Sequence, residues 1–521
     1  METGRWLLAL LPVLVLFVLI LSGKVKPLWS AVIALALAVL LAAWPFAAPP
    51  ATVLGGGAKG LWLGTWILLV VVPALLLYRL AKTAGMERLG ETFTRYLPNH
   101  TDRLLLLAWI FPSFVQGVAG FGTPIAICAP LLVLLGYDKV RAVVLPLVGY
   151  HWSVTFGSMG ASFYMAALTA DLATSAQEQL ALHASGLLAI NMLVAGVLVL
   201  LIDGGARQLR AGAATLLTVG AGMAATLVIC ATAVPAVASL AAGSAGLLVL
   251  TGKRLLSIHT GRRAGVAEEA APSQGGSRSV LVLAPYAYLL LLVLPVFLVP
   301  PARRFVTDLV ALAPSFPRTT TGLGWVNAAV SGYLPVPVFG HPGFYLALAC
   351  LLGWLTYRRA HLWPTGDGRQ VLGSWLSAIR SSAPTILVLG CLAMVLVDAG
   401  MVATLANGVA DTAGGAYPAL SSTVGAMGSF MTGSSTASNA LFAALQAEVA
   451  GLIGVPPTLL VAAQTAGANV GNAIAPVVIM VGAAAVGAHD RVGQIARRCL
   501  LPVGILLVVD VVAVLLYLGT Q

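Results

Sequence analysis

Two stretches rich in small polar residues lie inside apolar sequence, one in each half of the chain. Residues 114–124 read FVQGVAGFGTP, and residues 430–445 read FMTGSSTASNALFAAL. Hydroxyl and amide groups can bind a small anion without a fixed cation when helix starts and glycine backbone N–H groups assist them. For any single residue, close packing between helices is the alternative. From these stretches and the polar breaks that follow them, we expect the binding residues to be Gln116, Gly120, Gly122, Thr123, Tyr150, His151, Ser434, Ser435, Ser438, Asn439, Asn469 and Asn472.

Three titratable residues lie in or beside apolar segments, where proton chemistry is a possible role. His151 titrates near neutral pH and suits proton coupling, although a neighbouring carbonyl or hydroxyl could equally satisfy its ring. Asp510 lies within LLVVDVVAVLL, where a carboxylate costs about 2.5–3.5 kcal/mol and needs a proton or a partner. It is either a proton relay or part of a structural network with Arg380 or a hydroxyl. Asp398 is expected to lie at a helix end in contact with solvent.

The composition places the chain among polytopic membrane proteins. Of its 521 residues, 59% are hydrophobic and 9% are charged, with a mean hydropathy of +0.97, whereas a soluble domain carries roughly a quarter charged residues. The net charge of +11 comes from basic residues in short loops between apolar segments, as the positive-inside bias produces. Nucleic-acid binding is therefore not expected. The five cysteines have no metal-ligand spacing, and no phosphate-binding loop is visible, so we expect no metal or cofactor.

Apolar segments predict about twelve transmembrane helices. They cover approximately residues 6–21, 29–47, 61–80, 142–168, 181–202, 213–231, 235–252, 279–300, 342–357, 382–398, 458–486 and 499–518. The polar stretch 253–278 is interpreted as a cytoplasmic linker, and the Pro-rich stretch 301–341 as an irregular segment on the outside.

The first glycine-rich stretch is interpreted as the tip of a hairpin that enters the membrane and turns back. Neither flanking arm reaches the roughly 20 residues that a span needs, and backbone that leaves the helix at membrane depth must be buried or line a wet cavity. Lys139 and Arg141 follow the second arm. A hairpin keeps these two cations on the cytoplasmic side with the others. A glycine-kinked packing helix is the alternative.

The second half of the chain repeats the first. Each half contains a hairpin candidate followed by an apolar segment with a polar break, which is typical of inverted-repeat transporters. We predict an all-α polytopic membrane protein with two inverted repeats, each with a re-entrant hairpin and a broken helix. The expected parts are an N-terminal extra helix at 1–27, a first repeat at 28–212 (hairpin about 104–136), connecting helices and a linker at 213–341, and a second repeat at 342–521 (hairpin about 418–455).

Three motifs resemble the bacterial L-lactate permease family. They are AGFGTPIAICAPLLVLLGY (119–137), VLPLVGYHWSVTFGSMG (144–160) and GSFMTGSSTASNALFAALQ (428–446), and the order agrees over roughly residues 5–518. The resemblance implies a secondary transporter in the bacterial inner membrane that moves L-lactate, glycolate or related 2-hydroxymonocarboxylates with protons. It also implies an ion-transporter-like fold with inverted repeats. Its partners would be a small organic anion, a proton and the lipid bilayer; the sequence leaves the oligomeric state open.

Two stretches depart from the family pattern. Residues 150–153 read YHWS where the family has an Asn-Thr-Ala-Pro type sequence, and residues 471–477 read GNAIAPV where Gly-Lys-x-Ile-Ser-Pro-Gln is usual. Asn472 thus stands where the family has a lysine that could pair with a carboxylate. We hypothesise that His151 compensates for the lost positive charge. A sodium-coupled carrier of another small organic anion, such as a dicarboxylate, is one alternative. A membrane subunit of a decarboxylase pump is another, and a channel is disfavoured by the paired broken helices.

Overall fold

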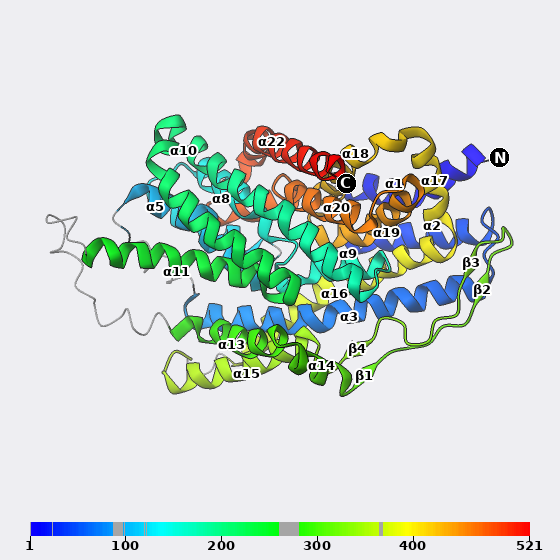
Figure 1. Ribbon diagram of the computed structural model, residues 1–521, viewed down its shortest axis with the longest axis horizontal. Helices are drawn as coiled ribbons and strands as arrows, with labels where there is room; N and C mark the ends of the chain where they lie inside the picture. Colours follow the sequence, from blue (N-terminus) through cyan, green and yellow to red (C-terminus); the bar gives the residue numbers. More distant parts are fainter. Residues whose placement is uncertain are drawn as a thin grey trace.

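The chain folds into an elongated, almost entirely helical body in the computed structural model (Figure 1). The structure describes residues 2–22, 24–86, 97, 99–118, 120, 122–259, 281–363 and 368–520. Most of the predicted linker, residues 260–278, lies outside the described residues, as do Ala119 and Phe121 of the first glycine-rich stretch.

The first half begins with three apolar helices and then breaks into shorter pieces. The three helices are α1 (Glu2–Leu21), α2 (Pro27–Ala43) and α3 (Pro50–Thr83). The shorter pieces are α5 (His100–Leu105), the π-helical turn η1 (Leu106–Ile110), α6 (Phe111–Val118), α7 (Thr123–Leu134), α8 (Lys139–Tyr150), the 3₁₀ turns η2 (His151–Ser153) and η3 (Ser158–Gly160), and α9 (Ala161–Thr169). The long helix α10 (Thr174–Ala233), the turn η4 (Pro235–Val237) and α11 (Ala238–His259) complete this half.

The second half starts after the undescribed linker. It contains the turn η5 (Leu281–Leu283), α13 (Ala284–Leu298), α14 (Pro300–Asp308), α15 (Pro342–Arg359), α16 (Gly368–Asp398), α17 (Met401–Ala413) and the turn η6 (Gly414–Ala416). The chain ends with α18 (Pro418–Thr432), α19 (Ser435–Ile453), α20 (Pro457–Asn472), α21 (Pro476–Ala485), the turn η7 (His489–Arg491) and α22 (Val492–Gly519). The helices α14 and α17 were not among the predicted segments.

Between α14 and α15 the Pro-rich segment forms two small antiparallel ladders. β1 (Ala311–Leu312) pairs with β4 (Val336–Pro337), and β2 (Thr319–Thr320) pairs with β3 (Val326–Asn327). The indole nitrogens of Trp62 and Trp66 on α3 donate to the carbonyls of Leu334 and Pro335 at 2.9 and 3.4 Å. The segment predicted to be irregular is therefore held in place against α3.

Seven helices in the described part of the chain are long and apolar enough to cross a membrane, so the protein is an integral membrane protein. The count of about twelve spans stays a prediction. One reason for the lower number is α10, which joins two predicted spans, 181–202 and 213–231, into one 60-residue element. It bends at Gly204 and Gly205, where Gly205 has φ 62° and ψ −151°, a conformation that essentially only glycine adopts.

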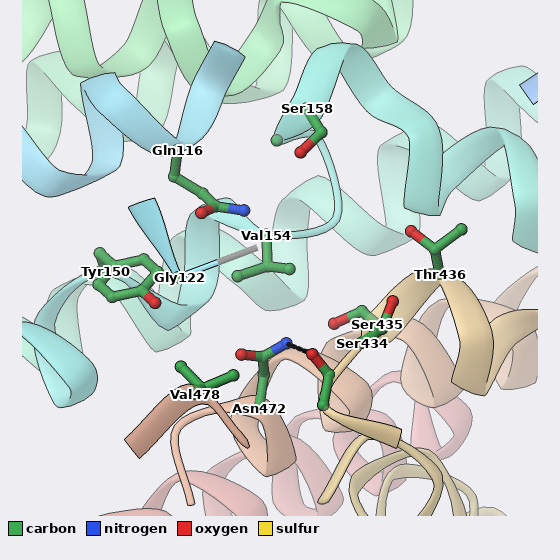
Figure 2. A pocket seen from close by; sticks show the side chains of 12 residues that line it. Gln116, Gly122, Tyr150, Val154, Ser158, Ser434, Ser435, Thr436, Asn472 and Val478 are labelled. Carbon is green, nitrogen blue, oxygen red and sulfur yellow. Dashed lines mark hydrogen bonds between the residues drawn. The ribbon is translucent and has the colours of Figure 1, made fainter. Parts of the chain in front are cut away.

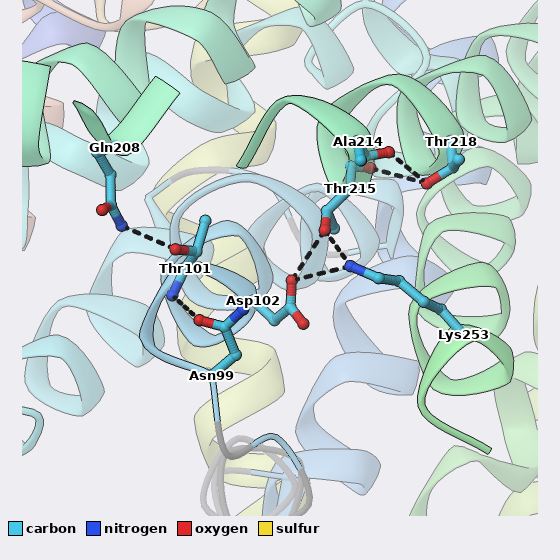
Figure 3. Close-up of polar contacts among 8 residues, drawn as sticks. All are labelled: Asn99, Thr101, Asp102, Gln208, Ala214, Thr215, Thr218 and Lys253. Carbon is cyan, nitrogen blue, oxygen red and sulfur yellow. Dashed lines mark hydrogen bonds and ion pairs between the residues drawn. The ribbon is translucent and has the colours of Figure 1, made fainter. Parts of the chain in front are cut away.

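Near the bend of α10, a polar cluster connects α5 to α11 and to the arm of α10 that follows Gly205 (Figure 3). The Thr215 hydroxyl donates to Asp102 Oδ1 at 3.0 Å. Lys253 Nζ lies 3.4 Å from the same oxygen and also donates to Thr215. Gln208 Nε2 donates to Thr101 Oγ1 at 3.0 Å. The cluster holds the bent arm of α10 against the start of α5.

Helices α3 and α16 form the most extensive helix pair, and glycine lets their backbones approach. A Cβ atom added at Gly60 would lie 2.4 Å from both Gly390 O and Cys391 Cα. Small residues at such a crossing are how membrane helices associate closely. Helix α2 packs on α16, α15 packs on α3, and α1 packs on α2, so the pair is flanked by apolar helices.

A buried ion pair joins these two helices, and it corrects the expectation for Asp398. Lys59 Nζ lies 2.9 Å from Asp398 Oδ2 and 3.1 Å from Oδ1, and the two side chains are only 11% and 6% exposed. The ammonium also lies 5.9 Å from the centroid of Phe316 and 6.0 Å from that of Tyr333. The prediction that Asp398 contacts solvent was wrong, because α3 and the 311–337 segment cover the end of α16.

We predict that Asp398→Ala strongly destabilises the protein. The change leaves the Lys59 ammonium buried without its carboxylate, and breaking a buried pair in this way costs about 3–5 kcal/mol. The measurement is the midpoint of thermal unfolding in detergent, which should fall clearly below that of the wild type.

The combined change Lys59→Met with Asp398→Leu should recover most of that loss, because no charge then remains buried. The matched control is Asp490→Ala, whose pair with Arg491 is 3.9 Å long and largely exposed. It should leave the midpoint unchanged. An Asp398→Ala protein as stable as the control would contradict this account.

Candidate functional site

A small cavity lies where the two polar stretches meet (Figure 2). Its volume is about 30 Å³, on a scale where one water takes about 10–15 Å³. Among the residues that line it in the described chain, none carries a charge. They are Gln116, Gly122, Tyr150, Val154, Gly157, Ser158, Gly433, Ser434, Ser435, Thr436, Asn472 and Val478. The cavity is thus bounded mainly by uncharged hydrogen-bonding groups from both halves of the chain.

Two helices of the hairpin stretches begin at this cavity. α7 starts at Thr123, directly after the lining residue Gly122, and α19 starts at Ser435, after Ser434. The Ser434 hydroxyl accepts a hydrogen bond from the N–H of Ala437 at 3.3 Å and so caps α19. The partial positive charge of a helix N-terminus stabilises an anion placed near it. Both starts therefore favour negative charge in the cavity.

The second parts of the two broken helices also begin here. α9 follows the turn that contains Ser158, and α21 starts four residues after Asn472. Left-handed glycines make the turns between elements possible, with φ 80° at Gly122 and φ 69° at Gly433. A side chain at either position would strain the backbone. The glycines identified in the sequence thus serve to end one helix and start the next at the cavity.

Half of the twelve predicted binding residues line the cavity: Gln116, Gly122, Tyr150, Ser434, Ser435 and Asn472. Figure 2 shows Gln116 and Tyr150 on one side, with Asn472 and the two serines on the other. The amide nitrogen of Asn472 lies 3.5 Å from the carbonyl oxygen of Gly433, which orients this side chain along the hairpin turn. The structure therefore brings together predicted residues that lie more than 300 positions apart.

The other six are close in sequence but do not line the cavity. They are Gly120, Thr123, His151, Ser438, Asn439 and Asn469. Gly120 packs directly against Ser158, since a Cβ at Gly120 would lie 2.2 Å from the serine Oγ. Thr123 is in the first turn of α7, where its N–H donates to Gly120 O at 3.2 Å.

The ring of His151 is buried and turned toward its own helix. Nδ1 lies 2.7 Å from the carbonyl oxygen of Val148, and because a carbonyl only accepts, Nδ1 carries a proton. Nε2 is buried without a hydrogen-bond partner among the described residues. The ring therefore does not line the cavity beside Asn472, and a role of His151 in proton transfer stays a hypothesis.

Asn439 and Asn469 belong to a buried network that joins the two broken helices. The Thr155 hydroxyl lies 3.0 Å from both Thr465 Oγ1 and Asn469 Oδ1. The amide of Asn439 donates to Thr465 Oγ1 at 2.8 Å and to Ser162 Oγ at 3.0 Å. This network fixes the unwound segment 151–160 against α19 and α20, and so sets the shape of the cavity wall.

Ser438 belongs to a second chain of hydrogen bonds that connects α18, α19 and α20. Its hydroxyl donates to Gly425 O at 2.9 Å and accepts from Gln464 Nε2 at 3.1 Å. Gln446 Nε2 donates to Gln464 Oε1 at 3.1 Å, and Ser421 Oγ donates to Gln446 Oε1 at 2.9 Å. All four of these side chains are completely buried. In this conformation Ser438 is a packing residue.

Asp510 is buried between α22 and α10, away from the cavity. The sequence suggested Arg380 or a hydroxyl as its structural partner. The structure instead shows the amide of Asn191, which donates to Asp510 Oδ1 at 2.6 Å. Asp510 Oδ2 and Asn191 Oδ1 have no hydrogen-bond partner among the described residues. No lysine or arginine of the described residues forms an ion pair with this carboxylate. This arrangement can hold a proton.

The other six lining residues were not among the predicted binding residues: Val154, Gly157, Ser158, Gly433, Thr436 and Val478. Ser158 has φ 46°, a left-handed conformation that is uncommon for serine. The sequence FGSMG contained one usable signal, since Gly157 and Gly160 flank the serine. Two glycines so close together interrupt a helix and expose the residues between them.

The chain is similar to known permeases over nearly all of its length. The family model described as L-lactate permease matches residues 5–519. The L-lactate permease of Escherichia coli K12 is 29% identical over 517 residues, covering 94% of this chain and 92% of the relative. The glycolate permease of the same strain is 27% identical, covering 94% and 91%, and the L-lactate permease of Bacillus subtilis 168 is 25% identical, covering 94% and 92%.

A solved structure, the YdaH transporter of Alcanivorax borkumensis, aligns with this chain at a TM-score of 0.49 and 14% identity. The alignment covers 90% of this chain and 88% of that one.

We predict that two neighbouring serines of α19 differ in their effect on stability. Ser438→Ala removes a hydroxyl that is bonded on both sides in a fully buried site and should cost about 1–3 kcal/mol. Ser435→Ala removes a hydroxyl without a partner among the described residues and should leave stability nearly unchanged. Thermal unfolding in detergent measures both. Equal losses would contradict the assignment of Ser438 to packing and Ser435 to the cavity.

Proposed function

Since the chain belongs to the L-lactate permease family, we propose that it is a secondary transporter for L-lactate, glycolate or a related 2-hydroxymonocarboxylate. It would move the anion together with a proton across the cytoplasmic membrane of a bacterium. The chain is a transporter and not an enzyme. The observation that carries the proposal is the uncharged cavity at which helix starts from both halves meet.

The chemistry of the cavity suits a small monocarboxylate. Helix N-termini and the hydroxyls of Ser434, Ser435 and Tyr150 can share one negative charge. The amides of Gln116 and Asn472 can donate to or accept from a 2-hydroxyl group. A site without a fixed cation binds an anion moderately, which permits release on the other side. The movement of a monoanion together with one proton also transfers no net charge across the membrane.

We further propose that the architecture consists of two inverted repeats, residues 28–212 and 342–521, preceded by an extra helix at 1–27 and joined by 213–341. In support, α6–α7 and α18–α19 are helix pairs with short connections, and each is followed by a broken helix, α8–α9 or α20–α21. A long helix follows each of these, α10 or α22. Broken helices in corresponding positions are where transporters of this kind bind substrate.

Asp510 is the residue that we propose to carry the proton. It is a buried carboxylate with a neutral partner, and such a residue inside a membrane protein is a functional candidate. It lies on α22, which packs against α8 and α20, the first arms of both broken helices. Its protonation can thereby influence the elements that form the cavity.

Uptake of labelled L-lactate into proteoliposomes tests the proposal. We expect an imposed pH gradient to drive uptake and a sodium gradient alone to have no effect. Glycolate should compete, and succinate should not. Uptake driven by sodium and blocked by succinate would replace this proposal with a sodium-coupled dicarboxylate carrier.

The same assay locates the site when Asn472 is changed to Asp, which keeps the size but adds a negative charge at the cavity wall. Uptake should fall at least about tenfold, since the added charge repels the anion in a site of low dielectric. The control is Asn407→Asp, at an exposed asparagine of α17, which should transport normally. If both variants transported like the wild type, the cavity would not be the binding site.

Asp510→Asn tests proton coupling separately from binding. The variant cannot exchange a proton, so accumulation driven by a pH gradient should be lost. Exchange of labelled for unlabelled lactate across the membrane should remain, because that process needs no net proton movement. Asp411→Asn, at an exposed position of α17, is the control. An Asp510→Asn protein that still concentrates lactate would exclude Asp510 as the proton carrier.

A further inference from the structure

A second and much larger cavity lies next to the candidate site, with a volume of about 1160 Å³. Its walls come from α9, both ends of α10, η4, α13, α14 and the segment around 330–345. We propose that this cavity is the outer vestibule through which a small carboxylate reaches the candidate site, and that the turn Ser158–Gly160 is the partition between the two. The inference rests on the proposed function, whose site it connects to one side of the membrane.

The two cavities are separated by a single turn of the chain. Gly157 and Ser158 line the small cavity, and the next residue, Met159, lines the large one. Figure 2 shows Ser158 at the edge of the small cavity near Gln116. Consecutive residues of one turn therefore line the two cavities.

The partition has a strained backbone. Ser158, Met159 and Gly160 have φ values of 46°, 58° and 74°, and for the first two a left-handed conformation is unfavourable. Such strain persists only where the surroundings hold it in place, and it is concentrated in segments that move or bind. On the vestibule side the turn meets η4, since a Cβ at Gly160 would lie 3.1 Å from Ala236 Cα. A small movement of this turn would join the cavities.

The vestibule has charged groups at its mouth and aromatic groups inside. Arg303 lies 3.4 Å from Glu178, with side chains 35% and 55% exposed. Arg304 also lines the cavity and has no ion-pair partner among the described residues, so a carboxylate can meet a guanidinium there. Asp171 and Asp308 line it too. With Glu178, the lining has three carboxylates and two guanidinium groups, so an anion in the cavity meets both repulsive and attractive charges.

The inner wall suits a small organic solute. Tyr164 packs against Trp66 and Phe163, with ring centroids 4.7 and 5.4 Å apart. These rings lie on α3 and α9, next to the partition. Of the segments that carry the charged residues, 171–178 is acidic and favours a position outside the cell, whereas the arginines of 301–341 are contrary charges. The acidic segment therefore assigns the vestibule to the outer side.

Cysteine labelling in intact cells tests this assignment. The five native cysteines are buried, so the unmodified chain serves as the blank. Ala233→Cys places a thiol on the vestibule wall. Ile229→Cys, one turn earlier on the same helix, places it at a position that is 59% exposed but does not line the cavity. A membrane-impermeant sulfonate thiol reagent is added outside, and labelling is read by mass.

We expect Ala233→Cys to be labelled, Ile229→Cys to remain unlabelled, and labelling of Ala233→Cys to stop lactate uptake by the same cells. No labelling at Ala233, as in a cavity filled with lipid, would overturn the proposal, and so would labelling only in inside-out vesicles. Labelling without any effect on uptake would overturn it as well. Because labelling is read without transport, a chain that does not carry lactate would fail the proposed function and still give a labelling result.

A second pair of variants tests the partition. Ser434→Cys places a thiol in the small cavity, and Met159→Gly relieves left-handed strain at the wall. Because glycine stabilises the closed, left-handed turn, the outside reagent should label the double variant about five- to thirtyfold more slowly than Ser434→Cys alone. The matched control is Gly493→Ala in the same background, at a position with open space. A rate that Met159→Gly leaves unchanged would show that this turn is not the partition.

Discussion

Backbone that leaves helical geometry inside an apolar protein must find partners for its carbonyl and N–H groups, and this constraint governs the candidate site. The constraint applies at two breaks in helical geometry, residues 151–160 and 473–475. In the first, the hydroxyl of Ser239 donates to Ser153 O at 2.7 Å, and the amide of Asn469 donates to Trp152 O at 3.2 Å. Side chains from distant helices therefore satisfy the carbonyls that the break leaves free.

These side chains explain why polar residues of the candidate region divide into two groups. One group, with Thr155, Asn439 and Asn469, bonds to the broken backbone and to itself. The other, with Gln116, Ser435 and Asn472, faces the cavity. The first group keeps the second in place. A site built from neutral dipoles needs this support, because no ion pair among the described residues orients its donors.

Close helix packing is the second requirement of the arrangement. Helices α18 and α20 cross with almost no side-chain volume between them: a Cβ at Gly425, Gly467 or Gly471 would lie within about 2 Å of a carbonyl oxygen of the other helix. This contact brings the hairpin and the broken helix of the second half together. It also places Ser434 and Asn472 on the same cavity wall.

The sequence by itself determined the class, the family and the two stretches that form the candidate site, because hydropathy, loop charge and motifs are local properties of the chain. It predicted half of the cavity-lining residues, since glycines and hydroxyls at a helix start are recognisable. Only the tertiary structure decided that Ser158 lines the cavity, that Ser438 does not, that Asn191 is the partner of Asp510, and that Lys59 buries Asp398. Each of these contacts depends on which helix packs against the residue. The paired residues are 13 to 339 positions apart, so the local sequence pattern does not indicate the pairing.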